Sequence, residues 1–196
     1  MKTFIKNTIT LIVISAFALS CAPQSSQTAE SPRDSVNQED KNVGSANFEQ
    51  GKTDAEFVLA AADGGMLEVR LGELALQKAL SPEVKAFAQS MVTDHGKANE
   101  ELKVLTNKLN HSIPQTLSAT SQEKYDAIAQ KDGEVFDRAY AEVMIADHKE
   151  TIEKFYAQTN NGSGSEINEW AEAKIPILEH HLMMAEKMYD IVKKSE

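Results

Sequence analysis

The chain has 196 residues, of which 41% are hydrophobic and 26% charged, the composition of an ordinary globular protein with one core. Its formal net charge is −10, which argues against nucleic acid as a partner because the phosphates would repel an acidic surface. It has one cysteine, which excludes an intramolecular disulfide. Its 5 prolines and 9 glycines leave room for long uninterrupted helices.

Residues 1–21 have the pattern of a bacterial export signal. Two lysines precede a short apolar run, TITLIVISAFAL, which is too short to span a bilayer stably. The run ends in Leu19-Ser20-Cys21, which resembles the lipobox of bacterial lipoproteins. We therefore predict a lipoprotein signal peptide over residues 1–21 with lipidation at Cys21. The alternative is an ordinary cleaved signal that ends near a cysteine.

The resemblance to lipoproteins implies where the mature protein works. The one partner that we predict is a membrane, to which the N-terminal lipid would anchor the protein. The sequence does not indicate a protein partner. Ala22, and not an aspartate, follows the cysteine, which by similarity to enterobacterial sorting favours the outer membrane or its periplasmic face. Residues 22–52 are rich in Ser, Gln, Asn, Asp and Glu, so we predict a disordered tether there.

From residue 53 onward apolar residues recur with a period near 3.6, which indicates amphipathic helices. The predicted long helices span residues 54–80, 82–110, 134–159 and 166–194, with a shorter one over 122–131. We predict an all-α domain over residues 53–196: a ferritin-like four-helix bundle with an up-down arrangement of two helical hairpins.

Several local signals set the expected helix ends. Thr53 with Glu56 forms a capping box, and Ser81 followed by Pro82 is a strong start signal. The pair Asp132-Gly133 predicts a break, and Ser165 is the expected cap of the last helix. Pro176 lies inside that helix and should kink or loosen one turn.

Two of the predicted helices carry the same pattern, aromatic-Ala-x-x-Met-[Val/Ile]-x-Asp-His. It spans residues 87–95 in one helix and 140–148 in the other. This suggests an internal repeat in which two hairpins are related by a pseudo-two-fold axis. Methionine and histidine stand four residues apart in it, so they lie on one helix face.

The inward stripes gather candidate metal ligands at the middle of the domain. Glu68 needs a partner there, because an unpaired buried charge is costly. One hypothesis is a transition-metal site, for copper or iron. Its main ligands would be Glu68, His95, His148 and His181. The weaker candidates are Met91, Met144, Met184, Asp94, Asp147 and His180.

The alternative hypothesis is a metal-free network of Glu68, the histidines and Tyr140 as a core polar partner, with the methionines as apolar filler. No cofactor would then be present. His111, near the end of its helix, is expected at the surface or as a cap.

The chain resembles the bacterial domain-of-unknown-function 4142 family over residues 53–192, on four stretches in the right order. These are residues 66–75, 87–95, 136–148 and 175–182. The family is exported, is often described as predicted outer-membrane proteins, and has a ferritin-like helical fold. The resemblance implies the fold and an envelope location, and it implies no settled activity.

The chain departs from ferritin-like di-iron proteins, which use Glu-x-x-His on two helices. None of its histidines has an acidic residue three positions earlier, so ferroxidase activity is not expected. We expect a binding protein rather than an enzyme. One alternative is a structural, interaction or stress-related module of the envelope with a metal-free polar core, and a third hypothesis is a redox enzyme of ferritin-like ancestry.

Overall fold

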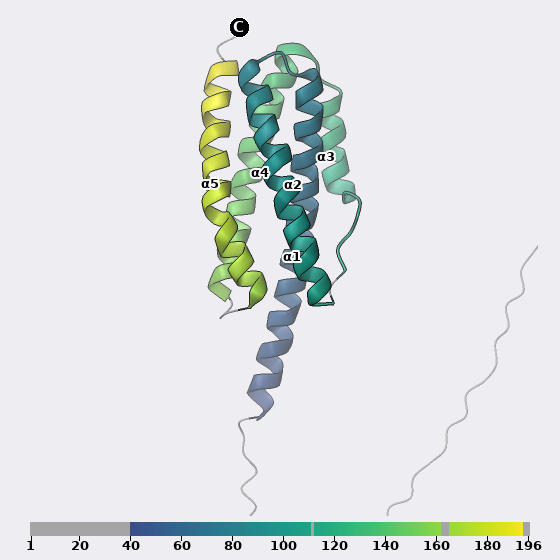
Figure 1. Ribbon diagram of the computed structural model, residues 1–196, viewed down its shortest axis with the longest axis vertical. Coiled ribbons are helices and arrows are strands. Elements are labelled where there is room, and N and C mark those ends of the chain that lie inside the picture. Colours follow the sequence, from purple (N-terminus) through teal and green to yellow (C-terminus); the bar gives the residue numbers. More distant parts are fainter. Residues whose placement is uncertain (1–39, 111, 162–164, 194–196) are drawn as a thin grey trace, which may run out of the picture. The chain divides into compact units, whose positions relative to one another are not determined.

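The computed structural model describes residues 40–110, 112–161 and 165–193, and this part of the chain is all-helical with no strand. The all-α fold class is therefore confirmed (Figure 1). The predicted signal peptide with Cys21, residues 22–39 of the predicted tether, and His111 lie outside the described residues. The five helices are α1 (Asp40–Lys78), α2 (Pro82–Lys108), α3 (Ala119–Ala129), α4 (Gly133–Asn161) and α5 (Glu166–Val192).

Three of the predicted helix ends are where the local signals put them. Ser81 caps α2, where its hydroxyl accepts the backbone N–H groups of Glu83 and Val84, and Pro82 occupies the first helical position. Ser165 caps α5 in the same way through the N–H of Asn168. Gly133 has a φ of 61°, a left-handed conformation that glycine adopts without strain, and α4 begins at this residue.

The start of α1 differs from the prediction. The backbone is helical from Asp40, inside the segment predicted to be a disordered tether, and Thr53 is an interior residue of the helix instead of its cap. Extending an existing helix adds one hydrogen bond per residue fixed, and this stretch contains no proline to stop it. Pro176 likewise does not end α5, which is assigned as one helix on both sides of it.

The helices pack in neighbouring pairs. α1 lies against α2, α4 against α5, α1 also against α4, and α2 against α5, while the short α3 lies beside α1 and α4 (Figure 1). Gly72 allows α1 to approach the α2 backbone closely. A Cβ there would lie 3.0 Å from the carbonyl oxygen of Ala88 and 2.9 Å from Val92 Cγ2. No described helix is long and apolar enough to cross a membrane.

Two apolar clusters fill the interior, one in each half of the helices' length. The first contains Phe87, Phe136 and Tyr140, and the second contains Phe57, Phe155 and Leu178. Along α2, α4 and α5 the two clusters are separated by a single buried histidine. We call the level of these histidines the polar layer. A functional site is expected there, because closely packed apolar side chains rarely carry out chemistry.

Candidate metal centre

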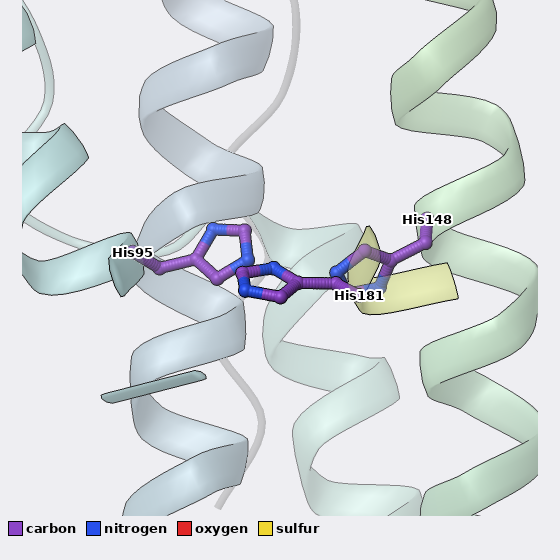
Figure 2. A group of neighbouring side chains, drawn as sticks. All are labelled: His95, His148 and His181. Carbon is purple, nitrogen blue, oxygen red and sulfur yellow. The ribbon is translucent and has the colours of Figure 1, made fainter. Parts of the chain in front are cut away.

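Three buried histidines meet in this polar layer. His95 on α2, His148 on α4 and His181 on α5 are 8%, 1% and 1% exposed. One ring nitrogen from each lies within 4.8 Å of the others, and the ring centroids are 5.3 to 5.5 Å apart. Figure 2 shows the three imidazoles pointing toward one another from separate helices. The tertiary fold thus assembles three of the predicted ligands into what we call the histidine triad.

Each member of the triad has one ring nitrogen without a hydrogen-bond partner among the described residues: His95 Nε2, His148 Nε2 and His181 Nδ1. The other nitrogen fixes the tautomer in two cases. Nδ1 of His148 lies 2.8 Å from the carbonyl oxygen of Met144, and Nε2 of His181 lies 2.9 Å from Asp94 Oδ2. Since both oxygens can only accept, the proton sits on those nitrogens and the free nitrogen carries a lone pair.

Burial keeps the triad uncharged near neutral pH. It lowers the pKa of His95 well below its usual range, and the neighbouring His148 and His181 add to that shift. It lowers the pKa of His148 to about 4, partly offset by the bond to the Met144 carbonyl. It also lowers the pKa of His181, against the opposing effect of Asp94. Neutral imidazole is the form that ligates metals.

Glu68, on α1, lies beside the triad without joining it. Its Oε1 is 3.7 Å from Nδ1 of His148, the nitrogen already bonded to Met144, and its Oε2 has no partner among the described residues. Burial, with help from Asp147, raises the pKa of Glu68 well above its usual range. Burial lowers the pKa of His148, so it opposes the charged form of both groups and disfavours an ion pair between them.

The two aspartates of the repeated motif have different partners. Asp94 is 45% exposed and accepts the hydrogen bond from His181. Asp147 is buried and pairs with Lys124 of α3 at 2.6 Å. Asp94 therefore fixes the orientation of the His181 ring, in the position that carboxylates commonly take behind metal-binding histidines, whereas Asp147 links α4 to α3.

The remaining candidates are three methionines, His180 and Tyr140. Met91 and Met144 are fully buried in the first apolar cluster, and Met184 packs against it, as core filler would. His180 is exposed on α5. Tyr140 is fully buried, but its hydroxyl has no hydrogen-bond partner among the described residues, so it does not close a polar network with Glu68 and the triad.

A cavity of about 130 Å³ adjoins the triad, with His95, His181 and Glu68 in its wall. A second cavity, of about 180 Å³, lies on the α3 side and is lined by Lys124, Asp147 and the same Glu68. Gly64 borders both, and a Cβ built on it would meet nothing within 4 Å. These openings give solutes a way toward the polar layer.

A family model described as "Domain of unknown function (DUF4142)" matches residues 39–188. The chain belongs to this family. No curated protein sequence matches it. The family resemblance inferred from the four sequence stretches is thereby confirmed.

Two solved structures share the fold. One, "CopM in the Cu(II)-bound form", is 20% identical with a TM-score of 0.60, and the match covers 70% of this chain and 95% of the other. The second, "CopM in the Ag-bound form (by co-crystallization)", is 21% identical with a TM-score of 0.58 and the same coverage. At this identity the likeness concerns the fold.

Some residues that shape the site were not singled out by the sequence. Phe87 stands edge-on to His148 and His181, with centroids 6.4 and 6.5 Å away, and so covers the triad on the side of the first apolar cluster. Lys124 was missed because the sequence predicts a short helix around it but does not show which helix it packs against. Gly64 could have been noticed as a small residue within one turn of Glu68 on an otherwise ordinary helix.

Proposed function

We propose that this domain binds a transition-metal ion, copper in particular, through His95, His148 and His181. The observation that carries the proposal is the meeting of three buried histidines. One ring nitrogen from each lies within 4.8 Å of the others, and each ring has a buried nitrogen without a hydrogen-bond partner among the described residues. An unsatisfied buried polar atom is destabilising, so three of them at one place call for a shared partner. A cation that accepts all three lone pairs supplies that partner.

The triad fits a metal after a small contraction. Three nitrogens no more than 4.8 Å apart lie at most about 2.8 Å from the centre of the circle that encloses them, whereas metal–nitrogen bonds measure about 2.0–2.1 Å. Each ring therefore moves by less than about 1 Å, within reach of side-chain torsions. The hydrogen bonds to Met144 and Asp94 already hold two of the rings with their lone pairs free.

Ligand chemistry and the two structural neighbours both favour copper. Imidazole suits copper, zinc, iron and nickel, and copper(II) binds most tightly among the divalent ions of that series. One CopM structure is of the copper(II)-bound form and the other of the silver-bound form, and silver commonly stands in for copper(I). Iron is disfavoured because the two carboxylates that approach the triad lie at its hydrogen-bonded nitrogens: Glu68 is nearest Nδ1 of His148, and Asp94 is bonded to Nε2 of His181.

We further propose that the long helices form a ferritin-like, up-down four-helix bundle of two hairpins. The packing of α1 on α2 and of α4 on α5 supports this arrangement, as does the repeated Asp-His motif on α2 and α4. Distances between spin labels on α1 and α2, and on α4 and α5, test this arrangement. In an antiparallel hairpin the end of the first helix and the start of the second must lie close together.

We also propose that the protein is exported and anchored by a lipid on Cys21, which would place the copper site in the envelope. The support is the position of the only cysteine directly after the apolar run. Cells fed labelled palmitate should label the wild-type chain and not the Cys21→Ala variant. Equal labelling of both would refute the anchor.

The decisive experiment measures copper binding by the full-length protein in competition with a chromophoric chelator. We expect His95→Ala, His148→Ala and His181→Ala each to weaken binding by at least about 100-fold, because each removes a direct ligand. His180→Ala is the matched control: it removes an exposed imidazole next to His181 and should bind as the wild type does. Circular dichroism confirms that each variant is folded.

Two results would overturn the proposal. If the wild-type protein binds no copper, zinc or silver, the polar layer is a metal-free structural core, and the domain is better described as an envelope interaction module. If copper binds but the three triad variants bind as tightly as His180→Ala, the ion is held elsewhere.

A further inference from the structure

Glu68 is a buried polar group that the proposed copper site leaves without a role. It is 4% exposed, and its Oε2 has no hydrogen-bond partner among the described residues. A carboxyl group has an oxygen that accepts a hydrogen bond whether or not the group is ionised, and a buried acceptor left unpaired is destabilising. Glu68 therefore calls for a hydrogen-bond donor that the described residues do not supply.

Glu68 lies in the walls of both cavities, and the two cavities differ in chemistry. The second cavity, on the α3 side, has two lysine–carboxylate ion pairs in its wall, Lys124–Asp147 and Lys154–Glu150. The first cavity, of about 130 Å³, has a mainly apolar wall. A donor carried on an apolar body therefore fits the first cavity better than the second.

Gly64 helps to keep the first cavity open. It lies in the wall, and a Cβ built on it would meet nothing within 4 Å, so helix packing does not require a glycine there. Gly65, its neighbour, differs, because its Cβ would lie 2.1 Å from Asn99 Oδ1. Glycine inside a helix is destabilising relative to alanine. What Gly64 provides in return is space beside Glu68.

The first cavity has the size of one aromatic ring. An engineered apolar cavity of about 150 Å³ binds benzene, and this one measures about 130 Å³. Phe155 and Trp170 lie in its wall with their ring centroids 5.7 Å apart. Aromatic rings pack favourably against one another in tilted and edge-on arrangements. The wall thus suits a single aromatic ring.

The charged side chains in the same wall already have partners, which favours a neutral ligand. Lys97 and Lys174 both form ion pairs with Glu101, and Asp94 accepts the hydrogen bond from His181. A charged ligand would have to leave water for a mainly apolar wall, which is costly. A neutral ring that carries one donor group avoids that cost and satisfies Glu68.

We propose that the first cavity binds a small neutral aromatic molecule of the phenol class, whose hydroxyl donates a hydrogen bond to Glu68 while its ring packs against Phe155 and Trp170. This site goes beyond the proposed copper binding and does not depend on it, because protein side chains alone form its wall.

The experiment uses the full-length protein after dialysis against EDTA, so that metal plays no part. Phenol and toluene are the probes, because they have nearly the same shape and only phenol has a donor. Calorimetry gives the dissociation constants. Trp170 is the only tryptophan of the chain and lies in the wall, so its fluorescence reports whether this cavity is occupied. We expect phenol to bind with a Kd below about 1 mM, well within the ceiling for a ligand of its size.

Replacing Glu68 tests the hydrogen bond. Glu68→Leu removes the acceptor and should weaken phenol binding by about tenfold or more, whereas toluene binding should not weaken. Glu73→Leu is the matched control: it removes an exposed glutamate from the same helix and should bind both probes as the wild type does. Equal losses of phenol and toluene in Glu68→Leu would refute the hydrogen bond.

Filling the cavity tests the location. Gly64→Leu should abolish binding of both probes, whereas Gly96→Leu should not. Gly96 is also helical and also has nothing within 4 Å of its Cβ, but it lies in neither cavity wall. Because Gly64 borders both cavities, Ala98→Leu, in the wall of the first cavity and not of the second, should weaken binding as well. Circular dichroism confirms that each variant is folded.

Three results would overturn the proposal. The wild-type protein binds no phenol, or Gly64→Leu and Ala98→Leu bind phenol as the wild type does, or benzylammonium binds more tightly than phenol, which would make the ligand a cation. Copper binding by the triad is measured separately in the chelator competition. Failure of either proposal therefore leaves the other standing.

Discussion

Replacing Asp94 tests whether its hydrogen bond prepares His181 for a metal. The carboxylate accepts the Nε2 proton at 2.9 Å, which leaves the lone pair on Nδ1, the nitrogen that has no partner among the described residues. Without this bond His181 is free to take the other tautomer or another rotamer, and its nitrogen becomes a poorer electron donor. Asp94→Ala should therefore weaken copper binding although the residue itself is not a ligand.

The size of the loss follows from the exposure of the pair. Removing a carboxylate behind a histidine ligand typically costs about 10- to 100-fold in metal affinity, or about 1.4–2.7 kcal/mol. Asp94 is 45% exposed, so solvent screens its charge and the lower half of that range applies. Asp94→Asn should lose less than Asp94→Ala, since an amide oxygen can still accept the Nε2 proton.

The assay is the chelator competition used for the triad variants, and the control comes from the repeated motif. Asp147→Ala removes an aspartate at the same motif position that pairs with Lys124 instead of a histidine, so copper affinity should change by less than about threefold. Wild-type affinity in Asp94→Ala would refute the argument. Equal losses in Asp94→Ala and Asp147→Ala would show a general loss of structure.

Three further predictions concern the stability of the metal-free protein. Gly64→Ala should raise the free energy of unfolding by about 0.8–1 kcal/mol, because alanine favours the helix and the added Cβ meets no other atom. Gly72→Ala should lower the free energy of unfolding, because the added Cβ would press on the α2 backbone. Urea titration of both variants measures the two changes. The pKa of His148 is about 4 in the folded protein and 6.5 unfolded, so only the unfolded chain gains a proton in between. Stability attributable to this group is present above pH 6.5 and should fall by roughly 3 kcal/mol as the pH drops through 4, with a shallower fall in His148→Gln; flat stability across that range would contradict the shift. Ser81→Ala should cost about 1 kcal/mol in thermal unfolding, because two backbone N–H groups of α2 lose their acceptor, and an unchanged melting temperature would exclude that role.

Local chemistry made the helices predictable from the sequence. Ser81 with Pro82, and Ser165, are start signals whose effect is confined to one turn, so their outcome did not depend on the rest of the fold. The start of α1 was not predictable in this way. The polar residues before Thr53 indicate that this segment cannot form a hydrophobic core. They do not determine whether the helix that follows extends backward through the segment.

The sequence by itself also determined that His95, His148 and His181 face inward, because helical periodicity fixes the face of each residue. Only the tertiary structure decided that their nitrogens meet, since the axial register and rotation of three helices are set by packing contacts such as the close approach at Gly72. The same packing gave identical Asp-His pairs different partners. Asp94 lies opposite α5 and reaches His181, whereas Asp147 lies opposite α3 and reaches Lys124. A repeat in the sequence fixes spacing along a helix, and what each side chain meets depends on which helix packs across from it.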